Sequence, residues 1–235
     1  MLKVSRQPDG TPEIFASLQG EGAALGTPSV FLRLATCNLA CTWCDTRYTW
    51  DWANHDYFTE VMEMSWQEVR EKIVSLNCPH LVITGGEPLL QQQELAPLIG
   101  DLAQAGYTFE VETNGTISPT SSLTLQVHQW NVSPKLANSG NPLGRRQVDP
   151  TLRAFGALPN AYFKFVVEQP GDLEEVEALV GSYQLARDRV ILMPEGRDPD
   201  TLRQRSLWLS QLCVRAGFRF SPRLHILLWG DKRGT

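Results

Sequence analysis

The stretch SVFLRLATCNLACTWCDT, residues 29–46, joins an apolar run to a group of cysteines. Residues 29–35 are mostly apolar, which predicts a buried strand. Cys37, Cys41 and Cys44 follow directly in a C-x3-C-x2-C array and make up three of the five cysteines of the chain. Active sites in α/β folds lie past the carboxyl ends of the strands, so this stretch predicts a functional site at that edge.

Strands and helices alternate along the rest of the chain. Further strands are predicted at residues 80–84, 107–113, 129–133, 161–168, 189–194 and 224–229. Helices are predicted at 65–76, with Ser65 opening a capping box, and at 89–106, 172–184 and 198–217. This alternation indicates an α/β fold with βαβ units and a mostly parallel sheet, either open and doubly wound or part of a barrel.

Polar motifs stand directly after these strands. They are TGGEP at 84–88, ETNG at 112–115, SPK at 133–135 and MPEG at 193–196. The carboxyl ends of parallel strands meet at one edge of a sheet, so we expect these motifs and the cysteines to surround one site.

The length of 235 residues fits a single domain over residues 1–235. Residues 45–64 are rich in aromatic side chains without a steady period, which predicts a long loop or lid. The net charge of −5 gives no support for binding to nucleic acid or to an anionic membrane. Without an apolar leader or a spanning run, the sequence predicts a cytoplasmic protein, where thiols stay reduced.

Clustered cysteines in such a protein indicate a metal or catalysis more often than a disulfide. Three thiolates can hold a four-iron cube and leave one iron open, and an open position is what a catalytic metal needs. Cys78 and Cys213 lie far along the chain on or beside predicted helices. The alternative is a zinc site, for which His55 is the histidine nearest in sequence.

Two other features point to ligand binding. The Gly-Gly pair of TGGEP exposes backbone groups that can bind an ammonium group, to which Glu87 adds negative charge. Arg33 lies within an apolar strand, where an arginine is costly unless paired. A carboxylated ligand would be a good bidentate partner, and Glu21 or Asp45 would be the structural alternative.

The cysteine array followed by TGGEP closely resembles the radical S-adenosylmethionine superfamily. The resemblance implies a [4Fe-4S] cluster on Cys37, Cys41 and Cys44, whose open iron is chelated by S-adenosylmethionine to give a 5′-deoxyadenosyl radical. It implies a reduced, partial (β/α)6-type barrel with the site at the carboxyl ends of the strands. The residues it implies for binding S-adenosylmethionine are Trp43, Gly86, Glu87, Asn114, Ser133, Pro134, Lys135, Met193 and Glu195. Ordinary packing, capping or ion pairing is the alternative for Trp43, Asn114, Ser133 and Lys135.

A longer pattern resembles the 7-carboxy-7-deazaguanine synthase family. It comprises QGEG at 19–22, the F-x-R of Phe31 to Arg33, and the C-D-T that ends the cysteine array, and LHILLWGDKRG at 224–234 looks like the ending of many members. The family converts 6-carboxy-5,6,7,8-tetrahydropterin to 7-carboxy-7-deazaguanine with loss of ammonia, on the route to queuosine and other 7-deazapurines. The resemblance also implies magnesium, a homodimer and an electron donor such as flavodoxin.

Residue by residue, the family's substrate contacts fall on Leu18, Gln19, Gly20, Glu21, Arg33 and Thr84, and its magnesium ligand falls on Thr46. A glutamine offers both a donor and an acceptor to a pterin edge, and a glutamate accepts from paired N–H groups. No catalytic residue beyond the cluster ligands is assigned. For His225 two alternatives stay open, a place near the site and a satisfied place in the core, which is the commoner one for a histidine in an apolar strand. The alternatives are a glycyl-radical activase, which would lack QGEG and C-D-T, and a non-catalytic metal-binding module.

Overall fold

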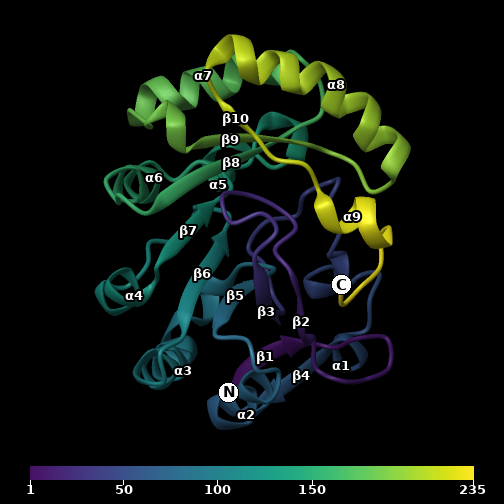
Figure 1. Ribbon diagram of the computed structural model, residues 1–235, viewed down its shortest axis with the longest axis vertical. Coiled ribbons are helices and arrows are strands. Elements are labelled where there is room, and N and C mark those ends of the chain that lie inside the picture. Colours follow the sequence, from purple (N-terminus) through teal and green to yellow (C-terminus); the bar gives the residue numbers. More distant parts are fainter.

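The computed structural model describes residues 1–235 and contains one ten-stranded sheet (Figure 1). The strands are β1 (Leu2–Ser5), β2 (Ile14–Leu18), β3 (Pro28–Leu34), β4 (Val61–Met64), β5 (His80–Gly85), β6 (Thr108–Thr113), β7 (Gln129–Val132), β8 (Ala161–Val167), β9 (Val190–Pro194) and β10 (Arg219–Phe220). Their order is β10-β9-β8-β7-β6-β5-β3-β1-β4, with β2 paired to β3 outside this path.

The run from β3 to β10 is parallel, whereas β1, β2 and β4 pair antiparallel. The larger helices are α2 (Trp66–Ser75), α3 (Gln92–Gln104), α4 (Ser121–Gln126), α6 (Asp149–Gly156), α7 (Asp172–Tyr183) and α8 (Pro199–Ala216). Figure 1 shows them along the outside of a curved sheet whose inner face stays free of helices. The sheet does not close on itself, so the predicted α/β partial barrel is confirmed.

The hydrophobic core lies between the sheet and the outer helices. Trp130 on β7 and Phe155 on α6 are fully buried and meet edge to face with ring centroids 5.4 Å apart. Ser65 and Glu68 form the predicted capping box at the start of α2. Pro97 lies inside α3 without ending it. None of the helices combines the length and the apolar character that crossing a membrane requires.

The strand predicted at 224–229 is wrong, because Leu224–Trp229 forms helix α9. The run LHILLW is too short for periodicity to distinguish a strand from a helix. Only Ile226 is buried in α9, whereas Leu227, Leu228 and Trp229 remain exposed. The helix lies on the open side of the barrel, where no neighbouring strand is available for pairing (Figure 1).

The prediction of a loop over residues 45–64 is also wrong at its end. Val61–Met64 forms β4, which pairs antiparallel with β1, and Tyr57–Glu60 forms the short helix α1. The short η1 turn (Arg47–Thr49) directly follows the cysteine array. The pairing with β1 gives this segment a regular structure that its uneven hydrophobic pattern did not predict. Between β3 and β4 the chain forms only the η1 turn and the four-residue helix α1. The first longer helix, α2, follows β4.

Two glycines let backbone segments approach closely beside the cysteine array. A Cβ at Gly86 would overlap the carbonyl oxygen of Thr36, and a Cβ at Gly85 would overlap the backbone of Leu34. Gly86 N–H donates to Leu34 O at 3.0 Å, and Glu87 N–H donates to Thr36 O at 2.9 Å. The Gly-Gly pair of TGGEP therefore holds the end of β5 against the start of the cysteine array.

We expect Gly86→Ala to destabilise the protein by about 1–3 kcal/mol, because the added methyl group must displace backbone. Gly100→Ala is the matched control: Gly100 lies in α3 with open space around its Cβ position. There alanine should stabilise the helix by about 0.5–1 kcal/mol. Urea unfolding of both variants measures the difference, and equal midpoints would contradict the close approach at Gly86.

Candidate active site

One cavity lies at the carboxyl ends of the parallel strands and takes in almost every residue that the sequence singles out. Of the predicted residues it is lined by Leu18, Gln19, Gly20, Glu21, Arg33, Cys37, Cys41, Trp43, Cys44, Thr46, Thr84, Gly86, Asn114, Ser133, Lys135, Met193 and Glu195. Glu87 and Pro134 do not line it. The expectation that the motifs after the strands surround one cavity is therefore confirmed by the fold.

The three cysteines of the array face this cavity with free thiols. An N–H group points at each sulfur: Leu39 N lies 3.4 Å from Cys37 Sγ, Asn141 Nδ2 lies 3.2 Å from Cys41 Sγ, and Trp50 Nε1 lies 3.3 Å from Cys44 Sγ. Hydrogen bonds from N–H groups to sulfur are typical surroundings of iron–sulfur thiolates. The donor set therefore fits a cluster.

No three His, Cys, Asp or Glu side chains converge closely enough to hold one metal ion. A four-iron cube does not require such convergence, because each thiolate binds a different iron. His55, the possible fourth ligand of a zinc site, is instead 3.7 Å from Glu60 and is absent from the cavity lining.

Lys135 and Trp43 form one wall of the cavity. The Lys135 ammonium donates to Ser133 Oγ at 2.8 Å and lies 5.6 Å from the centre of the Trp43 ring. The Trp43 indole donates to Asn138 Oδ1 at 3.2 Å, which fixes the ring in place. Asn114 Nδ2 donates to Asn38 Oδ1 at 2.9 Å and reaches within 4.0 Å of Cys37 Sγ.

The Glu87 carboxylate is fully buried beneath the cavity. It accepts hydrogen bonds from Leu89 N at 3.0 Å, Thr113 Oγ1 at 2.8 Å and Asn114 N at 2.7 Å. Burial raises its pKa despite these donors. Glu87 therefore joins the TGGEP turn to the ETNG turn without lining the cavity, and the negative charge that it adds for S-adenosylmethionine stays a prediction.

Gln19 is buried, and its amide is already satisfied by the protein. Its Nε2 donates to Glu110 and, at 3.3 Å, to Glu112 Oε1, while its Oε1 accepts from Glu21 N at 3.2 Å. The prediction that its side chain offers a free donor and acceptor does not match this arrangement. Gln19 meets the cavity beside Glu112, whose other oxygen accepts from Thr84 Oγ1 at 2.7 Å.

Glu21 pairs with two cations from distant parts of the chain. Its carboxylate binds Lys164 on β8 and, at 3.0 Å, Arg223 Nε just before α9, and the side chains of both cations are at least nine-tenths buried. Burial alone would raise the pKa of Glu21, but the charges of Lys164 and Arg223 hold it well below its ordinary value. A folded pKa below the unfolded value of 4.5 means that this carboxylate stabilises the fold above about pH 4.5. The contribution is lost as the pH falls further.

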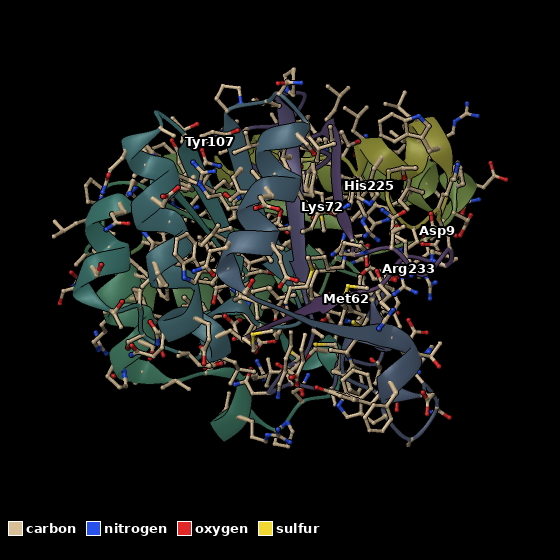
Figure 2. The ribbon with its side chains drawn as sticks, turned by 90° about the horizontal axis from the view of Figure 1, so that it is seen from below. Asp9, Met62, Lys72, Tyr107, His225 and Arg233 are labelled. Atoms are coloured by element: carbon tan, nitrogen blue, oxygen red, sulfur yellow. The ribbon has the colours of Figure 1, made fainter.

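The loop of residues 19–22 packs against α9 and the segment before it. Leu224 N–H donates to Gly20 O at 2.9 Å, and Gly22 N–H donates to Ser221 Oγ at 2.9 Å. A Cβ at Gly20 would overlap the ring of His225, which explains the glycine. His225, labelled in Figure 2 on the C-terminal helix, lines the cavity and is 3.9 Å from Glu21, so of its two alternatives the structure agrees with the place near the site.

Arg33 has a structural partner that the sequence analysis did not name. Its Nε donates to Glu13 Oε1 at 2.7 Å, whereas Glu21 and Asp45 pair with Arg223. Glu13 is fully buried and also binds Tyr48 and Arg233. Burial alone would lower the pKa of Arg33, but its neighbours raise it overall, so it stays charged. No partner is found for either Nη group of Arg33, which lines the cavity.

The remaining predicted residues lie at the edges of the cavity. Thr46 Oγ1 is 3.6 Å from Cys44 Sγ, and Glu195 pairs with Arg205. Met193 is buried at the end of β9. The C-terminal segment also reaches the cavity, at Thr235.

Several cavity residues were missed by sequence reasoning, namely Glu112, Asn131, Lys164, Arg223 and Trp50. A lysine inside AYFKFVVE carries the same signal as Arg33, a cation in an apolar strand that needs a partner. Glu112 stands within the ETNG motif, of which only Asn114 was selected. Arg223 and Trp50 lie outside any motif and have no comparable signal.

Comparison with known proteins agrees with this site. The family model of the radical SAM superfamily matches residues 33–121. The 7-carboxy-7-deazaguanine synthase of Pyrobaculum aerophilum is 43% identical over 94% of this chain and 95% of that protein. The protein of the same name from Halobacterium salinarum is 38% identical over 95% of this chain and 91% of that protein.

A solved structure is similar over the same length. The crystal structure of QueE from Escherichia coli superposes with a TM-score of 0.69, at 26% identity, and covers 95% of this chain and 94% of that chain. By its sequence and its fold, this chain belongs to the 7-carboxy-7-deazaguanine synthase family of radical S-adenosylmethionine enzymes.

Proposed function

We propose that this enzyme, a lyase, converts 6-carboxy-5,6,7,8-tetrahydropterin to 7-carboxy-7-deazaguanine with loss of ammonia, in the biosynthesis of queuosine and other 7-deazapurines. The observation that carries the proposal is the similarity to synthases of this name along nearly the whole chain. Neither a glycyl-radical activase nor a non-catalytic module is favoured, because the relatives share one name over that length.

The radical chemistry belongs to a [4Fe-4S] cluster with S-adenosylmethionine, which would supply a 5′-deoxyadenosyl radical when bound. Cys37, Cys41 and Cys44 would hold the cluster. Backbone groups of Gly86, with Ser133 and Lys135, would bind S-adenosylmethionine beside the Trp43 ring.

Arg33 is the proposed anchor for the carboxylate of the pterin. Glu13 holds the guanidinium by its Nε, so the two Nη groups remain for a ligand. A planar guanidinium binds a carboxylate through two parallel hydrogen bonds, which sets its orientation as well as its affinity. Two strands along the sheet from Arg33, Glu112 keeps acceptor capacity beyond its bonds to Gln19 and Thr84, and it can accept from N–H groups of the pterin ring.

The finer features of the family stay proposals for this chain. Thr46 is the proposed magnesium ligand, since its hydroxyl lines the cavity and magnesium takes few protein ligands. A homodimer, a flavodoxin-like electron donor and a cytoplasmic location are proposed by analogy with the family.

Anaerobic turnover tests the proposed function. Protein reconstituted with iron and sulfide is reduced and supplied with S-adenosylmethionine, magnesium and 6-carboxytetrahydropterin. We expect 7-carboxy-7-deazaguanine by mass with little net loss of S-adenosylmethionine. Cys37→Ala should abolish turnover and Cys78→Ala, outside the cavity, should not. Slow release of 5′-deoxyadenosine without product would contradict the proposed substrate.

We expect Arg33→Lys to raise the KM for the pterin about tenfold or more, because a charged hydrogen bond contributes about 1.5–3 kcal/mol. The lysine keeps a positive charge beside Glu13 but has no planar fork. Cleavage of S-adenosylmethionine without substrate should be unchanged. Arg70→Lys, at a half-exposed ion pair with Asp101, is the control. Unchanged KM in Arg33→Lys would exclude the substrate role of Arg33.

A further inference from the structure

Two of the cysteine sulfurs accept short hydrogen bonds, of 3.2 and 3.3 Å, from side chains outside the cysteine array. Cys44 Sγ accepts from the indole of Trp50 at 3.3 Å, and Cys41 Sγ accepts from the amide of Asn141 at 3.2 Å. Cys37 differs, because its closest donor is the backbone of Leu39 within the array, and the outside side chain nearest to it, Asn114, reaches only 4.0 Å from its sulfur. Neither Trp50 nor Asn141 has a part in the proposed binding of substrate or S-adenosylmethionine.

The position of Trp50 is set by the short turn η1. Thr49 is fully buried, and its hydroxyl donates to Thr46 O at 2.8 Å. Thr36 N–H donates to Thr49 O at 2.6 Å, which ties the turn to the end of β3. An indole nitrogen is only a donor, so the 3.3 Å contact with Cys44 can have only one direction.

Asn141 is fixed in the orientation that directs its NH2 group to sulfur. Its Oδ1 accepts from Ala40 N at 3.0 Å, and this bond identifies the oxygen end of the amide. The NH2 end faces Cys41 Sγ and also contacts Ser139 O at 3.4 Å and Ser139 Oγ at 3.2 Å. The side chain is buried, with an exposed fraction of 7%.

We propose that Trp50 and Asn141 raise the reduction potential of the iron–sulfur cluster through their N–H···S hydrogen bonds. The inference rests on the proposed function, since it requires the cluster on these cysteines. Reduction adds one negative charge to the cluster and its thiolates. The positive ends of two N–H dipoles stabilise that added charge, and hydrogen bonds to the sulfurs are a known determinant of cluster potential.

The effect is enhanced by burial. Asn141 and Cys41 are both buried, and water does not screen a dipole there as it does at the surface. Both donors follow the array in sequence, Trp50 shortly after it and Asn141 in the segment after β7. They are therefore positioning residues that act on the cluster, and they are not catalytic residues.

The test is a reductive titration of the reconstituted protein followed by electron paramagnetic resonance. Trp50→Phe removes the N–H group but keeps an aromatic ring. At a fixed ambient potential we expect an approximately tenfold lower ratio of reduced to oxidised cluster. This corresponds to a reduction potential that is lower by about 59 mV for a one-electron couple. Trp52→Phe is the matched control, since Trp52 is two residues away and contacts no cysteine sulfur.

The direction of the shift separates a lost hydrogen bond from a gap filled by water. Water near the cluster stabilises the added charge and would raise the potential, whereas loss of the N–H group lowers it. An unchanged or raised potential in Trp50→Phe therefore overturns the proposal. Should this variant not load the cluster, Asn141→Leu decides, because it is similar in size, removes the donor to Cys41 and adds no charge; an unchanged or raised potential there overturns the proposal. Absence of any cluster signal in the unmodified protein would instead reject the proposed function.

Discussion

The site depends on the pairing of Glu21 with Lys164 and Arg223 across the open side of the barrel. The sheet ends at β10 and β4 and does not close by strand pairing. The loop of residues 19–22 crosses this opening and binds β8, the segment before α9 and the start of α9. The contacts are two ion pairs, one backbone–backbone hydrogen bond and one hydrogen bond from Gly22 N–H to the Ser221 hydroxyl. Buried charges are stable only when paired, so removal of either partner leaves a charge in a place without water.

Most of the buried charged and polar groups around the cavity bind one another. Only a few groups are left to bind a ligand. Glu21, Gln19 and Glu87 are occupied by the protein itself. The Nη groups of Arg33 and part of the acceptor capacity of Glu112 are not. Such an arrangement holds a small charged substrate by few contacts while the surrounding network keeps those contacts in place. It suits a radical enzyme, in which exclusion of water matters as much as binding.

The sequence predicted the parallel sheet, its active edge and most of the cavity, because strand patterns and the motifs after them are local. It did not predict α9, since a short apolar run such as LHILLW is compatible with a strand or a helix. The absence of a neighbouring strand decides between them, and the sequence does not show that absence. The partner of Arg33 was misassigned for a similar reason. Glu13 lies just before β2, and the pairing of β2 with β3 brings it beside Arg33, but the sequence pattern did not predict β2. Trp50 and Arg223 reach the site only through tertiary packing.

A double-mutant cycle between Glu21 and Lys164 tests the account most directly. Urea unfolding and pterin affinity are measured for Glu21→Gln, Lys164→Met and the double variant. If the pair closes the site, each single variant should lose about 3–5 kcal/mol of stability, and the double variant should lose little more than either. Pterin affinity should fall in all three. Additive losses, or single variants that keep full stability and affinity, would contradict the claim that this pairing holds the site together.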